Sequence, residues 1–173
     1  DDRARAEKPG LTLTLQRTLD PGVGEVGLYP QEITRALLNL ISNGFYAAAK
    51  RQSEEADAAF EPILSATTKD LGKTVEIRIR DNGSGIPLEV MEKMFNPFFT
   101  TKPAGEGTGL GLSMSHDSVV KQNGGKIYVA TEHAVFTEFV IKRPRSAAAQ
   151  ATIGGPNWAL TSSSRTRSRR RTP

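Results

Sequence analysis

Cysteine is absent from the 173-residue chain, which excludes disulfide bonds and thiolate metal sites and fits a reducing cytoplasm. Long apolar runs are also absent. None approaches the ~20 residues that span a bilayer, and no apolar stretch follows a basic start as in a secretory signal. Position 1 is Asp1 rather than methionine, so we expect a piece of a longer protein. We expect a cytoplasmic domain, whether or not its parent is anchored in a membrane.

Acidic residues are missing from residues 147–173. That segment holds five arginines, Arg165, Arg167, Arg169, Arg170 and Arg171. The whole chain carries 23 basic and 19 acidic residues, so removing these five leaves 18 against 19. The basic character therefore belongs to the tail. An arginine run can bind nucleic acid or anionic lipid, but we favour a disordered, solvated tail over residues 146–173 and expect no nucleic-acid partner.

The remaining pattern predicts alternating strands and helices. Apolar residues at helical spacing predict a long helix over 31–50 and a second over 110–122, with a short helix over 88–94. Period-two alternation and turn residues predict strands over 11–18, 25–28, 63–68, 75–80, 126–131 and 136–142. Residues 51–58 and 96–107 are expected to be loops.

Strands in this order arrive in adjacent pairs, which favours a mixed, mostly antiparallel sheet over a doubly wound parallel one. The simplest fold is a two-layer α/β (α+β) sandwich with the helices on one face of the sheet. The polar side chains that alternate along Val75–Arg80 would then lie on the open face. One domain over residues 11–145 is long enough to bury its own core.

The first chemically informative segment lies on the long predicted helix. Asn39 and Asn43 are four residues apart in the sequence NLISN, so both project from one helical face. Amide oxygens are hard, neutral ligands that suit Mg²⁺ beside phosphate oxygens. A solvated polar stripe is the alternative when the two asparagines are considered alone.

The second segment, Asp81–Pro87 (DNGSGIP), follows a buried strand. Glycines there let a flat ligand approach the backbone, and a carboxylate can accept a hydrogen bond from an exocyclic amino group. An ordinary turn is the alternative, because Asp-Asn-Gly is good turn chemistry.

The third segment, Met94–Lys102 (MFNPFFTTK), holds three of the seven phenylalanines and has no helical or strand period. It predicts a loop anchored by aromatic side chains, with Lys102 free to reach an anion. The alternative for the phenylalanines is a simple contribution to the core.

The fourth segment, Gly105–Ser113 (GEGTGLGLS), has alternating glycines that lead into a helix start. Bare amides at such a start can bind phosphate. The segment lacks the Gly-Lys-Ser/Thr of a P-loop.

Taken together and in this order, the four segments resemble the N, G1, F and G2 boxes of the histidine-kinase catalytic domain. The resemblance covers roughly residues 10–145 and implies the Bergerat ATP-binding fold of the GHKL superfamily. It implies that residues 1–10 are the remnant of a linker from upstream dimerisation helices. It also implies ATP and Mg²⁺ as cofactors, with Asn39 and Asn43 as the catalytic and metal-binding residues.

By the same resemblance, Asp81 matches the acid that binds adenine, and Gly105 to Gly111 match a flexible ATP lid. Thr137 resembles a threonine near the adenine. The full set of expected nucleotide-binding residues is Asn43, Asp81, Gly83, Gly85, Ile86, Lys102, Gly105, Gly107, Thr108, Gly109, Leu110, Gly111, Leu112 and Thr137.

The sequence also departs from the family. Tyr46 stands where members often carry a basic residue, so Lys50, Arg51 or Lys102 could supply the charge for the phosphates, and the sequence does not choose among them. Asn123-Gly124-Gly125 replaces a frequent His-Gly-Gly. The segment Glu132–Ala134, between the last two predicted strands, is short and lacks the usual glycines.

The resemblance implies a protein-histidine kinase that donates the γ-phosphate of ATP to a histidine on a separate dimerisation domain and acts indirectly on a response regulator. His116 and His133 lack the context of a phosphoacceptor, so we expect the acceptor outside this chain and the chain itself to be a monomer. The alternatives are an ATP-hydrolysing machine of the same superfamily and an inactive binding module. Hydrolysis is disfavoured because Asn39 stands where those enzymes carry a glutamate base, and an amide cannot accept the proton from water.

Overall fold

The computed structural model describes residues 2–8, 11–55 and 59–145. The predicted disordered tail over residues 146–173 lies outside these ranges. Within them, no helix is both long and apolar enough to cross a lipid bilayer.

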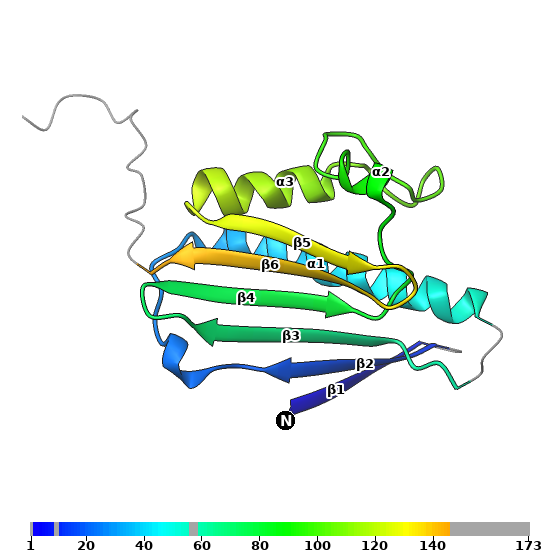
Figure 1. The fold of residues 1–173 in the computed structure, drawn as a ribbon, viewed down its shortest axis with the longest axis horizontal. Coiled ribbons are helices and arrows are strands. Elements are labelled where there is room, and N and C mark those ends of the chain that lie inside the picture. Colours follow the sequence, from blue (N-terminus) through cyan, green and yellow to red (C-terminus); the bar gives the residue numbers. More distant parts are fainter. Residues whose placement is uncertain (1, 9–10, 56–58, 146–173) are drawn as a thin grey trace, which may run out of the picture.

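A six-stranded sheet forms one layer of the fold (Figure 1). Its strands are β1 (Asp2–Lys8), β2 (Leu11–Thr18), β3 (Ile63–Asp70), β4 (Thr74–Asp81), β5 (Lys126–Glu132) and β6 (Phe136–Pro144), in the spatial order β1-β2-β3-β4-β6-β5. Only the β2–β3 pair is parallel. A parallel pair requires a crossover connection, which here contains the long helix. The predicted mixed, mostly antiparallel sheet is confirmed.

The helices form the second layer. The long helix α1 (Pro30–Glu54) runs across one face of the sheet, and α3 (Gly111–Asp117) packs beside it and continues as the π-helical turn η2 (Ser118–Gln122) (Figure 1). A single turn, α2 (Leu88–Met91), precedes the long loop, and the 3₁₀ turn η1 (Pro21–Val23) follows β2. The predicted two-layer sandwich is therefore confirmed.

The core lies between the two layers. Leu40 of α1 and Leu64 of β3 are fully buried, and they pack with Ile79 of β4 and with Phe139 and Ile141 of β6. Alternation sends the other β4 side chains to the opposite face, where Arg78 donates from Nε to Glu76 at 2.6 Å and from Nη1 to Glu138 at 3.1 Å. The charged face is thus paired within itself.

Arg145 joins the end of β6 to two turns at the edge of the fold. Its guanidinium donates to the carbonyls of Gly22 (2.8 Å), Val23 (2.6 Å) and Gly72 (2.9 Å), and it forms an ion pair with Asp70 at 2.8 Å. This ion pair holds the pKa of Asp70 below its ordinary value. One side chain therefore fixes both turns to the last strand.

Three sequence predictions differ from the structure. The predicted strand over 25–28 is wrong, because these residues form an irregular link from η1 to α1. The edge strand β1 was not predicted, since it is rich in charged residues that give no apolar alternation, as edge strands commonly are. Helix α1 runs four residues beyond the predicted end, because polar residues suit an exposed final helical turn as well as a loop. The origin of residues 1–10 as a linker remnant stays a prediction.

Candidate functional site

A cavity of about 660 Å³ opens between α1, the ends of β4 and β6, and the loop that leads into α3. All four sequence segments contribute to its lining. The predicted site residues in the lining are Asn39, Asn43, Asp81, Gly85, Ile86, Lys102, Gly105, Gly107, Thr108, Gly109, Gly111, Leu112 and Thr137. Gly83 and Leu110 are not in the lining, although each is next to residues that shape it.

Asp81, the last residue of β4, lines the cavity. It is paired with Thr137 across the β4–β6 ladder, and both side chains are buried. Its Oδ1 accepts a hydrogen bond from the Gly83 amide at 2.9 Å. Burial disfavours the charged carboxylate and raises the pKa of Asp81 to about 6, despite the lowering effects of that amide and of Arg80. The cavity is therefore lined by a buried acid whose pKa lies closer to neutral pH than that of an exposed aspartate.

A threonine pair fastens the Asp81–Pro87 turn to the last hairpin. Thr131 Oγ1 accepts from the Ile86 amide at 2.9 Å and donates to the Phe136 carbonyl at 3.0 Å. It also lies 3.5 Å from Thr137 Oγ1. Gly85 has φ +80°, and a Cβ there would come within 2.7 Å of the Glu132 carbonyl oxygen. Sequence reasoning missed Thr131; its only signal is its cross-strand position opposite Thr137.

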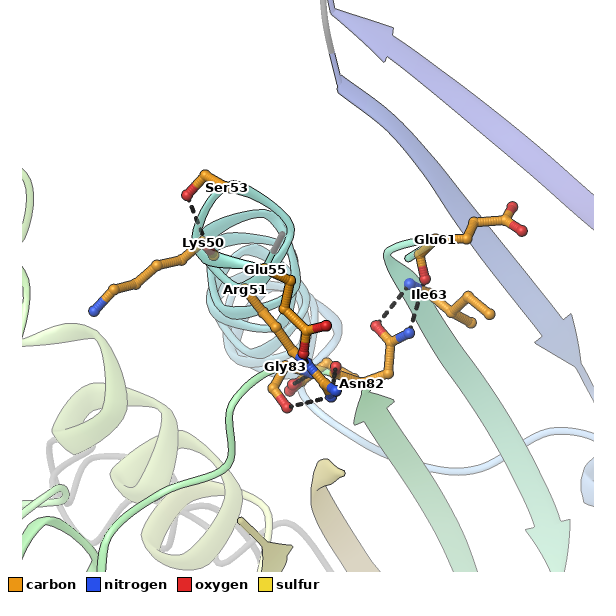
Figure 2. Close-up of polar contacts among 9 residues, drawn as sticks. Lys50, Arg51, Ser53, Glu55, Glu61, Ile63, Asn82 and Gly83 are labelled. Atoms are coloured by element: carbon orange, nitrogen blue, oxygen red, sulfur yellow. Dashed lines mark hydrogen bonds and ion pairs between the residues drawn. The ribbon is translucent and has the colours of Figure 1, made fainter. Parts of the chain in front are cut away.

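A second set of polar contacts holds the same turn from the side of α1 (Figure 2). Asn82 accepts from the Ile63 amide and donates to the Glu61 carbonyl, each at 2.8 Å, so it ties the end of β4 to the start of β3. Arg51 Nη1 donates to the Asn82 carbonyl at 2.9 Å and to the Gly83 carbonyl at 3.4 Å. Figure 2 shows Lys50 pointing away from this group. Sequence reasoning assigned no such role to Asn82.

Arg51 is therefore not the cation of the cavity. It is absent from the lining, and its Nε is bound to Glu55 at 2.7 Å. Lys50 does reach the lining, but its side chain is exposed and its ammonium lies 3.7 Å from the Glu54 carboxylate. Of these three basic residues, Lys102 is the one whose ammonium contacts the asparagine segment, at Asn43 Oδ1.

The two predicted metal-ligand asparagines differ in their partners. Asn43 Oδ1 accepts from Lys102 Nζ at 3.1 Å. Asn39 Nδ2 donates to Ser115 Oγ at 3.0 Å, and a Cβ at Gly111 would collide with the Asn39 amide oxygen. Both asparagines line the cavity, but Asn39 also joins α1 to α3. Ser115, which is buried, was missed because its link to Asn39 spans 76 residues of sequence.

Tyr46 connects α1 to the loop over the cavity. Lys102 Nζ lies 4.4 Å from the centre of the Tyr46 ring, and the Tyr46 hydroxyl donates to Glu106 Oε2 at 3.2 Å. Partial burial, together with the nearby Glu106 carboxylate, raises the pKa of Tyr46. This side chain thus touches both charged residues that the loop brings to the cavity.

The loop itself has little regular structure, as predicted. Residues 103–108 are exposed, and Gly105 (φ +89°) and Gly109 (φ +68°) have left-handed backbones. A Cβ at Gly109 would collide with the Phe98 backbone. The prediction that phenylalanines anchor the loop is only partly right. Phe99 lines the cavity, whereas Phe98 is 76% exposed.

Neither histidine lines the cavity. The His116 ring lies on α3 with its centre 5.2 Å from that of Phe95. His133 is exposed in the turn between β5 and β6.

The comparisons with known proteins agree on one family. The model of histidine kinase-, DNA gyrase B-, and HSP90-like ATPases matches residues 29–147. Sensor kinase CckA of Brucella abortus (strain 2308) is 38% identical over 133 residues, covering 75% of this chain and 14% of CckA. Sensor histidine kinase ZraS of Escherichia coli (strain K12) is 33% identical over 132 residues, covering 76% of this chain and 26% of ZraS.

A solved structure agrees with both. The nucleotide-free catalytic domain of histidine kinase ThkA matches with a TM-score of 0.64 and 28% identity, covering 77% of this chain and 79% of that one. The chain thus spans only 14% and 26% of the two curated relatives but most of the ThkA catalytic domain. The chain belongs to the histidine kinase-, DNA gyrase B-, and HSP90-like ATPase family, and it is an ATP-binding catalytic domain of the sensor histidine kinase type.

Proposed function

We propose that the cavity binds ATP with Mg²⁺ and presents the γ-phosphate to a histidine on a separate dimerisation domain. The observation that carries this proposal is the polarity of the cavity lining, which combines a buried acid, Asp81, with the Asn43–Lys102 amide–lysine pair. A nucleotide has the matching polarity, since its base carries an amino donor and its phosphates carry negative charge.

The adenine lies at the Asp81 end in this proposal. The Asp81 Oδ1 atom is already engaged by the Gly83 amide, so Oδ2 is the oxygen that accepts from the adenine amino group. Thr137 lies beside Asp81, and Ile86 supplies an apolar contact for the ring. Gly83 and Gly85 shape this end of the site indirectly, because a Cβ at Gly83 would meet Ala47 and one at Gly85 would meet the Glu132 carbonyl. Burial of the acid strengthens this hydrogen bond, because little water competes for it.

The phosphates lie at the other end. Asn43 Oδ1 fits Mg²⁺ because it is a neutral oxygen that already accepts from a cation, the Lys102 ammonium. Asn39 is the second candidate ligand, and its bond to Ser115 fixes the rotation of its amide. When bound, Mg²⁺ would neutralise charge on the β- and γ-phosphates. Lys102 contacts the same phosphates. It supplies the positive charge that family members often carry on this helix, at the position of Tyr46.

The loop over the cavity acts as the lid. Amides around Gly105, Gly107 and Thr108, and from Gly109 to Leu112, would close on the phosphates. These groups position the γ-phosphate and neutralise its charge, which is most of what phosphoryl transfer requires of a protein. The exposed backbone of residues 103–108 supports a segment that orders only around its ligand.

The acceptor lies on another segment or chain. An attacking atom must approach to ~3–3.5 Å, and neither His116 nor His133 borders the cavity. A free imidazole is a good nucleophile near neutral pH, so this domain needs no general base. We further propose that the domain is monomeric and cytoplasmic, acts indirectly on the receiver domain of a response regulator, and does not bind nucleic acid.

Two measurements test the proposal. Calorimetry with ATP and Mg²⁺ measures binding, and a steady-state assay measures phosphate release with and without a supplied histidine-bearing dimerisation domain. We expect binding, slow hydrolysis, and transfer to the added domain. Fast hydrolysis without transfer would favour the ATP-hydrolysing alternative, binding alone would favour an inactive module, and no binding would refute the site.

A further inference from the structure

Tyr46 of α1 contacts both charged side chains that the loop brings to the cavity, Lys102 and Glu106. Its ring faces the Lys102 ammonium, with Nζ 4.4 Å from the ring centre, and its hydroxyl donates to Glu106 at 3.2 Å. Lys102 is only partly buried, whereas its neighbours over 103–108 are exposed. Lys102 and Glu106 are therefore two points at which the loop contacts the helix, and Lys102 is the less exposed of the two.

The geometry restricts where the Lys102 ammonium can lie. One N–H donates to Asn43 Oδ1 at 3.1 Å, and the electron-rich face of the Tyr46 ring lies on another side of the same group. An ammonium has three donors, so the ring contact can persist while the bond to Asn43 is exchanged for another acceptor. Without the ring, a four-carbon side chain on an exposed loop would sample many rotamers.

We propose that Tyr46 is a positioning residue for Lys102. It holds the ammonium at the phosphate end of the cavity, while the ammonium moves from Asn43 Oδ1 to the phosphate oxygens as the metal–nucleotide complex binds. Asn43 Oδ1, which accepts from Lys102 without ligand, would then be free to hold Mg²⁺. The Tyr46 hydroxyl has a second effect, because it holds the Glu106 carboxylate to the helix and restrains its approach to the phosphates.

This inference rests on the proposed nucleotide site, but the contact itself can be tested without nucleotide. A methylene group beside an aromatic ring face shifts upfield in a proton NMR spectrum. We expect an upfield-shifted ε-CH₂ signal that disappears in Lys102→Met and loses its shift in Tyr46→Leu. Tyr46→Phe should keep the shift, because it keeps the ring. A Lys102 signal at the ordinary position in the native protein would overturn the inference.

The role in binding is tested by calorimetry with two ligands. Tyr46→Leu should weaken ATP·Mg²⁺ binding by about two- to fivefold, the range for a cation at a partly exposed ring, and leave adenosine binding unchanged because adenosine has no phosphate. Tyr46→Phe should lose less ATP·Mg²⁺ affinity than Tyr46→Leu, because it keeps the ring. In the Lys102→Met background, Tyr46→Leu should have no further effect, which is the coupling that a double-mutant cycle measures.

A rescue variant guards against trivial loss of folding. Tyr46→Lys in the Lys102→Met background puts an ammonium back near the ring position, so it should restore ATP·Mg²⁺ affinity without changing adenosine affinity. Equal losses for adenosine and ATP, or the same Tyr46→Leu effect without Lys102, would show a merely structural role and overturn the inference. If the native chain binds neither ligand, the proposed function fails and the binding role fails with it, whereas the NMR contact is judged separately.

Discussion

Replacing Asp81 by asparagine should strengthen the fold and weaken the site at once. Asp81 is 5% exposed, and burial raises its pKa from 3.8 to about 6. A rise of roughly 2 units corresponds to about 3 kcal/mol, at ~1.36 kcal/mol per unit. The folded state binds the proton more tightly than the unfolded state, so this energy is a penalty that grows as pH rises from about 4 through 6. Asparagine does not ionise, so the Asp81→Asn variant should not carry this penalty.

Urea unfolding across pH separates this effect from all other titrations. The free energy of unfolding of Asp81→Asn minus that of the native chain should be small near pH 4, increase to at most about 3 kcal/mol near pH 7, and stay constant above. The Gly83 amide bond is preserved, because the asparagine oxygen can accept it in place of Asp81 Oδ1. A difference that does not change with pH would refute the raised pKa.

Nucleotide affinity should move in the opposite direction. With the asparagine oxygen facing the Gly83 amide, the asparagine NH₂ faces the adenine amino group, so two donors meet. We expect calorimetry to show a loss of about 1.5–3 kcal/mol, the range for hydrogen bonds to charged groups. Adenosine affinity of the native chain should also fall below pH 6, as Asp81 gains its proton, while that of the variant stays flat. Unchanged affinity in the variant would remove Asp81 from the site.

The other predictions concern the metal, the lid, the acceptor and the fold. Asn43→Ala should abolish phosphotransfer yet leave the unfolding curve and adenosine binding intact; transfer at the native rate would contradict the assignment. Residues 97–109 should gain hydrogen-exchange protection when ATP·Mg²⁺ binds, and equal protection in both states would argue against a lid. The chain alone should acquire no acid-labile phosphate from labelled ATP. Label on the native chain that disappears in His116→Ala or His133→Ala would refute an external acceptor. Arg145→Ala should cost about 1.5–3 kcal/mol of stability in urea unfolding, because it removes charged bonds to two turns; a smaller loss would mean that these bonds are replaced by water.

Much of the fold could be predicted because its patterns are local. Ile33 and Leu40 recur at helical spacing on α1 and are buried, and β4 alternates cleanly because only one of its faces packs against helices. The strand β1 has no such pattern, since an edge strand is defined by backbone pairing to β2 rather than by a buried face.

The site was predictable as four segments but not as a set of contacts. Order and spacing indicated which residues would meet, and the cavity contains nearly all of them. The choice of Lys102 over Arg51 depends on contacts made 31 and 59 residues away in sequence, which no local pattern encodes. The same is true of the Asn39–Ser115 bond, which only the packing of α1 against α3 creates.

Transfer of labelled phosphate to a histidine outside this chain is the reaction by which the proposed kinase domain is defined. The chain is incubated with γ-labelled ATP and Mg²⁺, together with a dimerisation domain that carries its own phosphoacceptor histidine, and a copy of that domain with the histidine replaced by alanine serves as the control. We expect acid-labile, alkali-stable label on the histidine-bearing domain alone, dependent on Asn43 and Asp81 of this chain. Label that stays on this chain, or free phosphate released at the same rate whether or not the acceptor histidine is present, would contradict the proposed function.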